Sequence, residues 1–127
     1  MFAFGQHLSP TTQVLWSPWD QPLNEESPQW VIQSTSIGVS ELPQSQPFQW
    51  LWQSLPSQCF LMDLVYNLHG PTPFLEAADR EEKGYVGQDG LAMLVHQAAD
   101  ALQLWTHQSV ALVHREVLCQ ALRQEEI

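Results

Sequence analysis

The sequence predicts an α/β fold in which a short parallel sheet is followed by C-terminal helices. The first indication is a nearly continuous apolar run over residues 59–66, which is typical of a strand buried on both faces, and so of a parallel sheet. The second is a pair of helix starts after this strand, at Thr72-Pro73 and at Asp89.

The segments before residue 59 are shorter. Residues 30–33 predict a strand, residues 13–16 a less firm one, and residues 48–55 a short helix, whereas seven prolines between residues 9 and 58 favour loops. The expected order is strand, strand, crossover, strand and three helices. Residues 30–34 and 59–66 should be adjacent parallel strands with the later helices packed against them.

The two later helices have distinct start and stop signals. Thr72 as a cap, Pro73 in the first turn and Gly84 as a stop predict a helix over residues 73–83. Asp89 predicts the cap of a longer helix. The apolar residues of that helix recur at helical spacing and predict a core stripe: Leu91, Leu94, Val95, Ala98, Leu102 and Trp105.

A second stripe on the long helix consists of Gly90, Met93 and Gln97. A glycine at the helix start would let a ligand approach the backbone closely. Gln97 is open to two interpretations, either a ligand-binding side chain or a polar residue at the edge of a packed face. Spacing alone does not separate them.

Composition restricts the partners. The 127 residues suit one domain, and fourteen acidic residues against four basic ones give a formal net charge of -10, which disfavours nucleic acid and anionic membranes. The sequence has no apolar stretch near the ~20 residues of a membrane helix and no signal-peptide pattern, so a cytoplasmic protein is expected.

Cysteine, histidine and tryptophan give structural expectations. Cys59 and Cys119 should be reduced core thiols, and the five histidines show no metal-ligand spacing, although His96 could pair with Asp100. Among the six tryptophans, Trp30 and Trp105 are predicted to lie in the core. For Trp50 and Trp52 two interpretations stay open: one of them faces outward, or both pack within a small core.

Four motifs follow one another along the chain. They are Val31-Ile32-Gln33-Ser34-Thr35-Ser36-Ile37-Gly38-Val39, Asp63-Leu64-Val65-Tyr66-Asn67, Thr72-Pro73-Phe74-Leu75, and the segment from Asp89 to Ala99. In order and residues they resemble the C-terminal part of shikimate dehydrogenase, with motifs V-I-N-A-T-P-x-G-M, D-x-V-Y-N-P, T-P-F-L and D-G-L-G-M-L-V-x-Q-A-A. The resemblance covers residues 30–106 well, residues 107–124 as a terminal helix, and residues 1–29 loosely.

The resemblance implies the C-terminal half of a Rossmann-like dinucleotide-binding domain. The implied activity is the NADP-dependent reduction of 3-dehydroshikimate to shikimate, in chorismate and aromatic amino acid biosynthesis. By the family pattern, Tyr66 and Gln97 would bind the substrate. Thr35, Leu64, Gly90 and Met93 would bind the cofactor, Leu64 and Gly90 through their backbone. The sequence departs from the pattern at four places: Gln33-Ser34, Leu68, the loop at His69 and Gly70, and Ala92.

Two parts of that family's enzyme are missing from this sequence, namely the first domain with its catalytic lysine and aspartate and the Gly-rich cofactor loop. We therefore expect a truncated, single partial domain over residues 1–127, with a poorly defined start over residues 1–29 and a terminal helix over residues 107–127. No catalytic residue is assigned, and the isolated chain should be inactive. A companion chain or a homodimer would cover the exposed half-domain. The alternative is a non-catalytic binding or interaction module.

Overall fold

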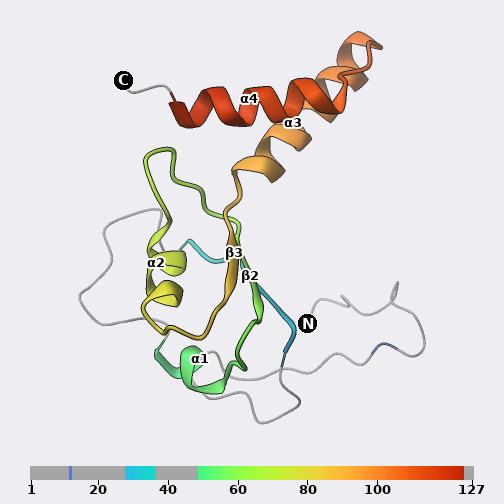
Figure 1. Cartoon of the computed structure of the whole chain (residues 1–127). Helices are drawn as coiled ribbons and strands as arrows, with labels where there is room; N and C mark the ends of the chain where they lie inside the picture. Colours follow the sequence, from blue (N-terminus) through green and yellow to red (C-terminus); the bar gives the residue numbers. More distant parts are fainter. Residues whose placement is uncertain (1–11, 13–27, 37–48, 125–127) are drawn as a thin grey trace.

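The computed structural model describes residue 12, residues 28–36 and residues 49–124. The predicted strand over residues 13–16 and the expected start of a helix at Phe48 lie outside these residues. The described elements are β1 (Trp30–Gln33), α1 (Gln49–Ser54), β2 (Phe60–Asp63), α2 (Pro73–Asp79), β3 (Val86–Gln88), α3 (Leu91–Thr106) and α4 (Leu112–Gln124), as Figure 1 shows.

The sheet has three parallel strands in the order β1-β2-β3. The expected parallel pairing is confirmed, because Trp30 lies beside Phe60 and Gln33 beside Asp63. The third strand, β3, was not predicted from the sequence. It is only three residues long and all three are exposed, so it gives no apolar run or alternation to recognise.

The core lies on one face of this sheet. Seven buried residues from α1, β2, α2 and the segment between α1 and β2 form it: Leu51, Trp52, Leu55, Cys59, Leu61, Phe74 and Ala78. Trp52 lies at its centre, with its ring centroid 5.3 Å from that of Phe74 and 6.0 Å from that of Tyr85. Trp50 is half-buried and packs against the same cluster, so the interpretation in which both tryptophans pack inward holds.

The opposite face of the sheet is not covered by any of the helices that the structure describes. Its residues Trp30, Ile32 and Val86 are 64, 60 and 58% exposed. The prediction that Trp30 lies in the core is therefore wrong, and so is the expectation that β2 is buried on both faces, since Phe60 and Met62 are only half-buried. An apolar run shows that a strand is compatible with burial on both faces, but not that a second layer is present.

The segment after α2 also differs from expectation. The helix starts as predicted, with Thr72 accepting a hydrogen bond from the Leu75 amide, but it ends at Asp79 rather than at Lys83. A turn follows, in which Glu82 and Gly84 have left-handed backbone angles (φ 52° and 69°). Lys83 instead donates to the carbonyls of Trp52 and Leu55, so it caps the C-terminal end of α1.

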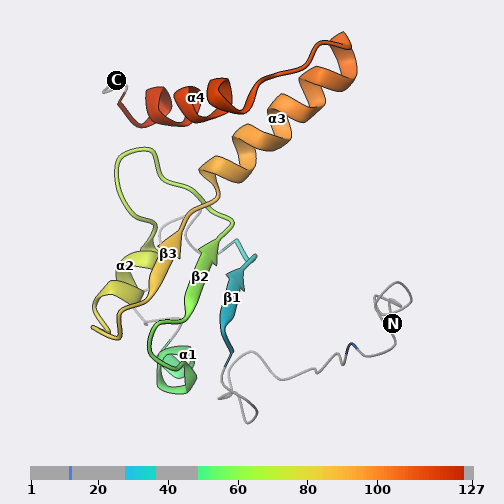
Figure 2. The same ribbon diagram turned by 45° about the vertical axis from the view of Figure 1, so that its right-hand side comes forward.

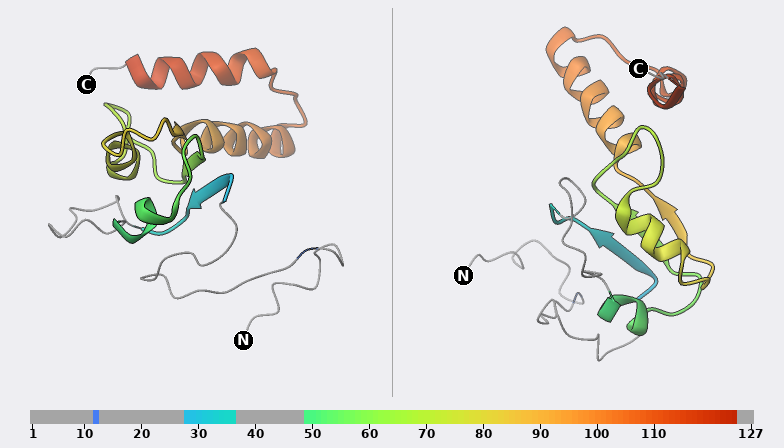
Figure 3. Two further views of the ribbon diagram at one scale, coloured as in Figure 1. Left: turned by 60° about the horizontal axis from the view of Figure 1, so that its bottom comes forward. Right: turned by 90° about the vertical axis from the view of Figure 1, so that its left-hand side faces the viewer.

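The long helix α3 does not pack on the sheet as expected. Figures 1 and 2 show it leaving the sheet beyond the carboxyl end of β3 and extending away, and Figure 3 shows α4 running back beside it. Only Leu91, Val95 and Ala99 of this helix are buried. The predicted core stripe is correct for Leu91 and Val95 and wrong for its other four residues, which are exposed: Leu94 (40%), Ala98, Leu102 (48%) and Trp105 (79%).

An ion pair and a hydrogen bond of Arg115 join α3 to α4. Arg115 lies 2.7 Å from the Asp100 carboxylate and 3.1 Å from Nδ1 of His96, so the expected pairing of His96 with Asp100 is replaced by a shared contact with Arg115.

Cys59 is a buried free thiol, as predicted, whereas Cys119 on α4 is free but only half-buried. Among the described residues, no helix is long and apolar enough to cross a membrane.

Candidate functional site

The carboxyl ends of the three strands meet at one edge of the sheet, which is where parallel α/β sheets bind ligands. Three of the four residues predicted to bind the cofactor follow these ends directly. Thr35 comes two residues after β1, Leu64 one residue after β2, and Gly90 two residues after β3. The fourth, Met93, is half-buried in the first turn of α3.

Leu64 and Gly90 are in direct backbone contact. The Gly90 amide donates to the Val65 carbonyl at 3.0 Å, and a Cβ placed on Gly90 would lie 2.2 Å from the Leu64 carbonyl oxygen. The expectation that this glycine would let a ligand approach the backbone closely stays a prediction. The backbone of Leu64 already requires a residue without a side chain at position 90, and Gly90 is buried against it.

Asp63 fixes the geometry of this edge. Its side chain is completely buried and accepts hydrogen bonds from Thr72 Oγ1 at 2.6 Å, the Val65 amide at 3.0 Å and Gln33 Nε2 at 3.3 Å. Gln33 Oε1 in turn accepts from the Thr35 amide. One carboxylate therefore links the end of β1, the turn after β2 and the cap of α2, which lie far apart in the sequence.

Burial raises the pKa of Asp63 above its ordinary value of 3.8. The hydrogen bonds from Thr72 and Val65 oppose this rise, and the negative charge of Asp89 adds to it. Sequence reasoning did not single out this network. The available signal was a carboxylate at the end of an apolar strand, because a buried charge requires partners.

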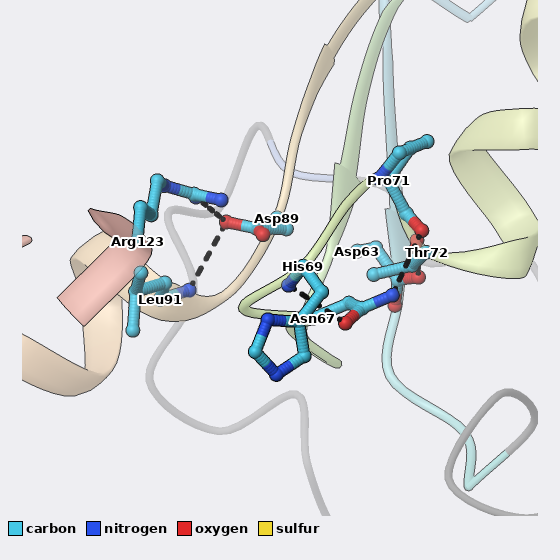
Figure 4. Close-up of polar contacts among 8 residues, drawn as sticks. All are labelled: Asp63, Asn67, His69, Pro71, Thr72, Asp89, Leu91 and Arg123. Atoms are coloured by element: carbon cyan, nitrogen blue, oxygen red, sulfur yellow. Dashed lines mark hydrogen bonds and ion pairs between the residues drawn. The ribbon is translucent and has the colours of Figure 1, made fainter. Parts of the chain in front are cut away.

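Asp89 organises the other side of the site, as Figure 4 shows. It is 6% exposed, accepts from the Leu91 amide at 3.3 Å, and pairs with Arg123 of α4 at 2.7 Å. The structure assigns the N-cap of α3 to Gly90, so the predicted capping by Asp89 is displaced by one residue. Arg123 was not predicted to lie near the site.

The two residues predicted to bind the substrate remain accessible. Tyr66 is 44% exposed in the turn after β2, and Gln97 is exposed on the second turn of α3. Gln97 is not buried against α4, and the buried residue Val95 lies about 160° away around the helix axis, at ~100° per residue. In the loop after Tyr66, Asn67 bonds to the Pro71 carbonyl and accepts from the His69 amide (Figure 4).

A large cavity lies away from the strand ends that carry the predicted site residues. About 820 Å³ lies beside α2 and β3, lined by Glu76, Asp79, Arg80, Glu82 and Tyr85 among others. None of the predicted site residues lines it. A second cavity, of about 490 Å³, lies at the opposite ends of β1 and β2.

Every basic residue of the sequence is engaged by a group of the chain itself. The sequence has four of them. Arg80 bonds to Glu76, Lys83 to the carbonyls of Trp52 and Leu55, Arg115 to Asp100 and Arg123 to Asp89. A dinucleotide phosphate would therefore have to compete with these groups for the lysine and the three arginines.

Comparison with known proteins identifies the similarity. The model of the shikimate 5′-dehydrogenase C-terminal domain matches residues 90–112, which begin at the Leu64–Gly90 junction. The shikimate dehydrogenase (NADP(+)) of Magnetococcus marinus is 38% identical over 120 residues, which are 94% of this chain and 39% of that protein. The chain is similar to the C-terminal part of shikimate dehydrogenase. The resemblance found in the motifs is thus confirmed.

A second relative and a solved structure are similar to the chain over the same part. The Synechocystis sp. enzyme is 40% identical over 93 residues, covering 72% of this chain and 30% of that relative. The solved structure of shikimate dehydrogenase 1 from Peptoclostridium difficile has 28% identity and a TM-score of 0.55, over 74% of this chain and 34% of that one. The predicted α/β, Rossmann-like class is confirmed. The shikimate dehydrogenase-like chain spans 39% or less of the length of these proteins.

Proposed function

We propose that this chain provides the nicotinamide side of a shikimate dehydrogenase-type site, and that the site works only when a second polypeptide completes it. The observation that carries this is the Leu64–Gly90 junction at the shared edge of three parallel strands, where the two backbones are in direct contact. In this proposal the flat nicotinamide ring lies against this junction. Substrate class and cofactor come from relatives named shikimate dehydrogenase (NADP(+)).

In this proposal the chain's own residues bind and orient the reactants. Leu64 and Gly90 contact the nicotinamide through backbone, with Thr35 lining the cleft and Met93 packing beside the ring. Tyr66 and Gln97 donate hydrogen bonds to the substrate and hold its carbonyl carbon near the ring. NADPH, when bound, supplies the hydride that reduces 3-dehydroshikimate. The proton for the carbonyl oxygen comes from a group of the second polypeptide, since this chain has no assigned general acid.

The phosphate end of the cofactor does not fit this chain alone. All four basic residues are engaged, and the formal net charge of -10 repels an anionic cofactor. The second polypeptide must therefore supply the phosphate-binding loop. The exposed face of the sheet, with Trp30, Ile32 and Val86, is the surface we assign to it, because parallel sheets are normally covered on both faces. The free thiols Cys59 and Cys119 suit a reducing, cytoplasmic location.

Nuclear magnetic resonance of the ¹⁵N-labelled chain tests the site. Millimolar NADP(+) should shift the backbone amides of Thr35, Leu64 and Gly90, whereas shikimate should shift that of Gln97. The variant Gln97→Ala should lose the response to shikimate but keep the response to NADP(+), and Gln103→Ala, at another exposed position of α3, should keep both. Shifts confined to the cavity beside α2 and β3 would refute the proposed site.

Calorimetry and reconstitution test the need for a second polypeptide. The chain alone should bind NADP(+) no more tightly than about 1 mM, or about -4 kcal/mol, and micromolar binding would contradict the proposal. Mixing the chain with the remaining part of the Magnetococcus marinus enzyme should restore shikimate-dependent reduction of NADP(+), measured by NADPH absorbance. Neither part alone should do so, and the Gln97→Ala chain should restore less.

A non-catalytic interaction module is the second candidate. The exposed apolar residues of α3 and α4 favour it, because they form a surface that the proposed chemistry does not use. If reconstitution fails while the chain still binds a protein partner, this second function is the better description.

A further inference from the structure

Gln33, the last residue of β1, holds two of the residues predicted to bind the cofactor. Its backbone carbonyl accepts a hydrogen bond from the Leu64 amide at 2.9 Å, and its side-chain Oε1 accepts one from the Thr35 amide. The side chain is buried, since the residue is 6% exposed. The turn after β1 and the turn after β2 are therefore both tied to one residue.

Hydrogen bonding at both ends fixes the orientation of the Gln33 carboxamide. A backbone N–H can only donate, so the atom that faces the Thr35 amide is the oxygen. At the other end, Asp63 Oδ1 accepts from the Val65 amide at 3.0 Å, so it is an acceptor also toward Gln33 Nε2, at 3.3 Å. The reverse orientation would place oxygen against oxygen and N–H against N–H. Both ends thus select the same orientation.

Asp63 is itself held in place, so it can anchor the carboxamide. It is completely buried and accepts a third hydrogen bond, from Oγ1 of Thr72 in the cap of α2, at 2.6 Å (Figure 4). Because a buried polar group that loses its partner keeps its desolvation cost, rotation of the Gln33 carboxamide away from Asp63 is unfavourable. The position of the Thr35 backbone relative to β2 therefore depends on a side chain as well as on strand pairing.

We propose that Gln33 is a positioning residue of the nicotinamide side of the site and acts through Thr35. By holding the Thr35 amide, it sets where the threonine side chain lies in the cofactor cleft. Gln33 does not contact the ligand through its side chain, because the carboxamide is buried and bonded within the chain at both ends. The inference rests on the proposed function, in which Thr35 lines that cleft.

Nuclear magnetic resonance of the ¹⁵N-labelled chain tests this with three variants. Gln33→Met keeps nearly the same shape and removes both side-chain bonds, whereas Gln33→Asn keeps a carboxamide that can close a turn two residues on. In Gln33→Met, hydrogen exchange of the Thr35 amide should rise at least tenfold. Millimolar NADP(+) should then no longer shift this amide but should still shift that of Gly90. Gln33→Asn should restore most of the Thr35 response. Gln88→Met, the same substitution at the exposed last residue of β3, should change neither response.

The contrast between Thr35 and Gly90 separates positioning from stability, because a variant that only loosens the fold affects both amides. A wild-type chain in which NADP(+) shifts neither amide overturns the proposed function, and with it the role of Gln33 at the site. A Thr35 response that Gln33→Met leaves intact, or a parallel loss at Thr35 and Gly90, overturns the positioning role alone. If Gln33→Met does not fold, the wild-type chain decides. The side-chain NH2 protons of Gln33 should exchange at least tenfold more slowly than those of the exposed Gln88, and equal rates overturn the positioning role.

Discussion

Replacing Gly90 by alanine tests the backbone junction at the strand ends. The backbone angles of Gly90 (φ -75°, ψ -4°) suit alanine, so any cost is steric rather than conformational. The added Cβ would lie 2.2 Å from the Leu64 carbonyl oxygen and 2.8 Å from its carbonyl carbon, and neither atom can move without moving the chain. Overpacking of this kind costs about 1–3 kcal/mol, and loss of the hydrogen bond to Val65 adds about 1 kcal/mol.

A gain from the lower entropy of the unfolded chain offsets about 0.4–1 kcal/mol of this cost. We therefore expect Gly90→Ala to lower the free energy of unfolding by about 1–4 kcal/mol, measured by urea denaturation followed by circular dichroism. Two matched substitutions calibrate it. Gly70→Ala meets no atom within 4 Å and should change stability by at most about 0.5 kcal/mol. Gly87→Ala meets only the flexible end of Leu75 and should cost less than Gly90→Ala. A Gly90→Ala protein as stable as the Gly70→Ala protein would refute the reasoning.

Three further predictions concern the charged groups and use the same denaturation assay. Asp63→Ala should lower the free energy of unfolding by about 3 kcal/mol, because it leaves three hydrogen-bond donors without an acceptor, at about 1 kcal/mol each. Asp63→Asn keeps an acceptor and should lower stability clearly less. Equal losses for the two variants would contradict this reasoning. Because the folded-state pKa of Asp63 is raised above 3.8, its contribution to stability is fully present below pH 3.8 and is lost as the pH rises through the raised pKa. The stability of the wild-type protein relative to Asp63→Asn should therefore fall with rising pH in that window, and a rise would show the wrong sign. Arg123→Ala should lower the free energy of unfolding by about 1 kcal/mol, because it leaves the buried Asp89 without its cation; the loss is no larger because the Arg123 side chain is 44% exposed. Arg80→Ala removes a more exposed ion pair and should lower stability less. The reverse order would contradict this explanation.

Local signals in the sequence were sufficient for the starts of elements and for strand pairing. Thr72 and Pro73 marked the start of α2 because capping involves only neighbouring residues. The end of α2 was misplaced because Lys83 is held by carbonyls of α1 about thirty residues earlier in the chain. No local pattern records such a contact. A three-residue exposed strand such as β3 is equally invisible, since only its pairing with β2 makes it a strand.

Periodicity located the apolar side of α3 but not what covers it. The spacing of Leu94, Leu102 and Trp105 is that of a core stripe, and their exposure shows that the covering layer is not among the described residues. At the site, Gly90 lies against the Leu64 carbonyl oxygen, and no pattern in the sequence indicated this contact between segments 26 residues apart. The role of Gly90 in binding a cofactor stays a prediction.

Two buried carboxylates hold the strand ends of this sheet edge together. Asp63 and Asp89 are both buried, and each is compensated by partners from this chain, Thr72 and Gln33 for one and Arg123 for the other. A cation that pairs with a buried carboxylate is no longer available to a phosphate. Under the proposed function, the arrangement that stabilises this sheet edge therefore also weakens binding of an anionic cofactor. We accordingly expect that a polypeptide which supplies new cations beside the edge raises the affinity for NADP(+) without changing any contact that holds Leu64 against Gly90.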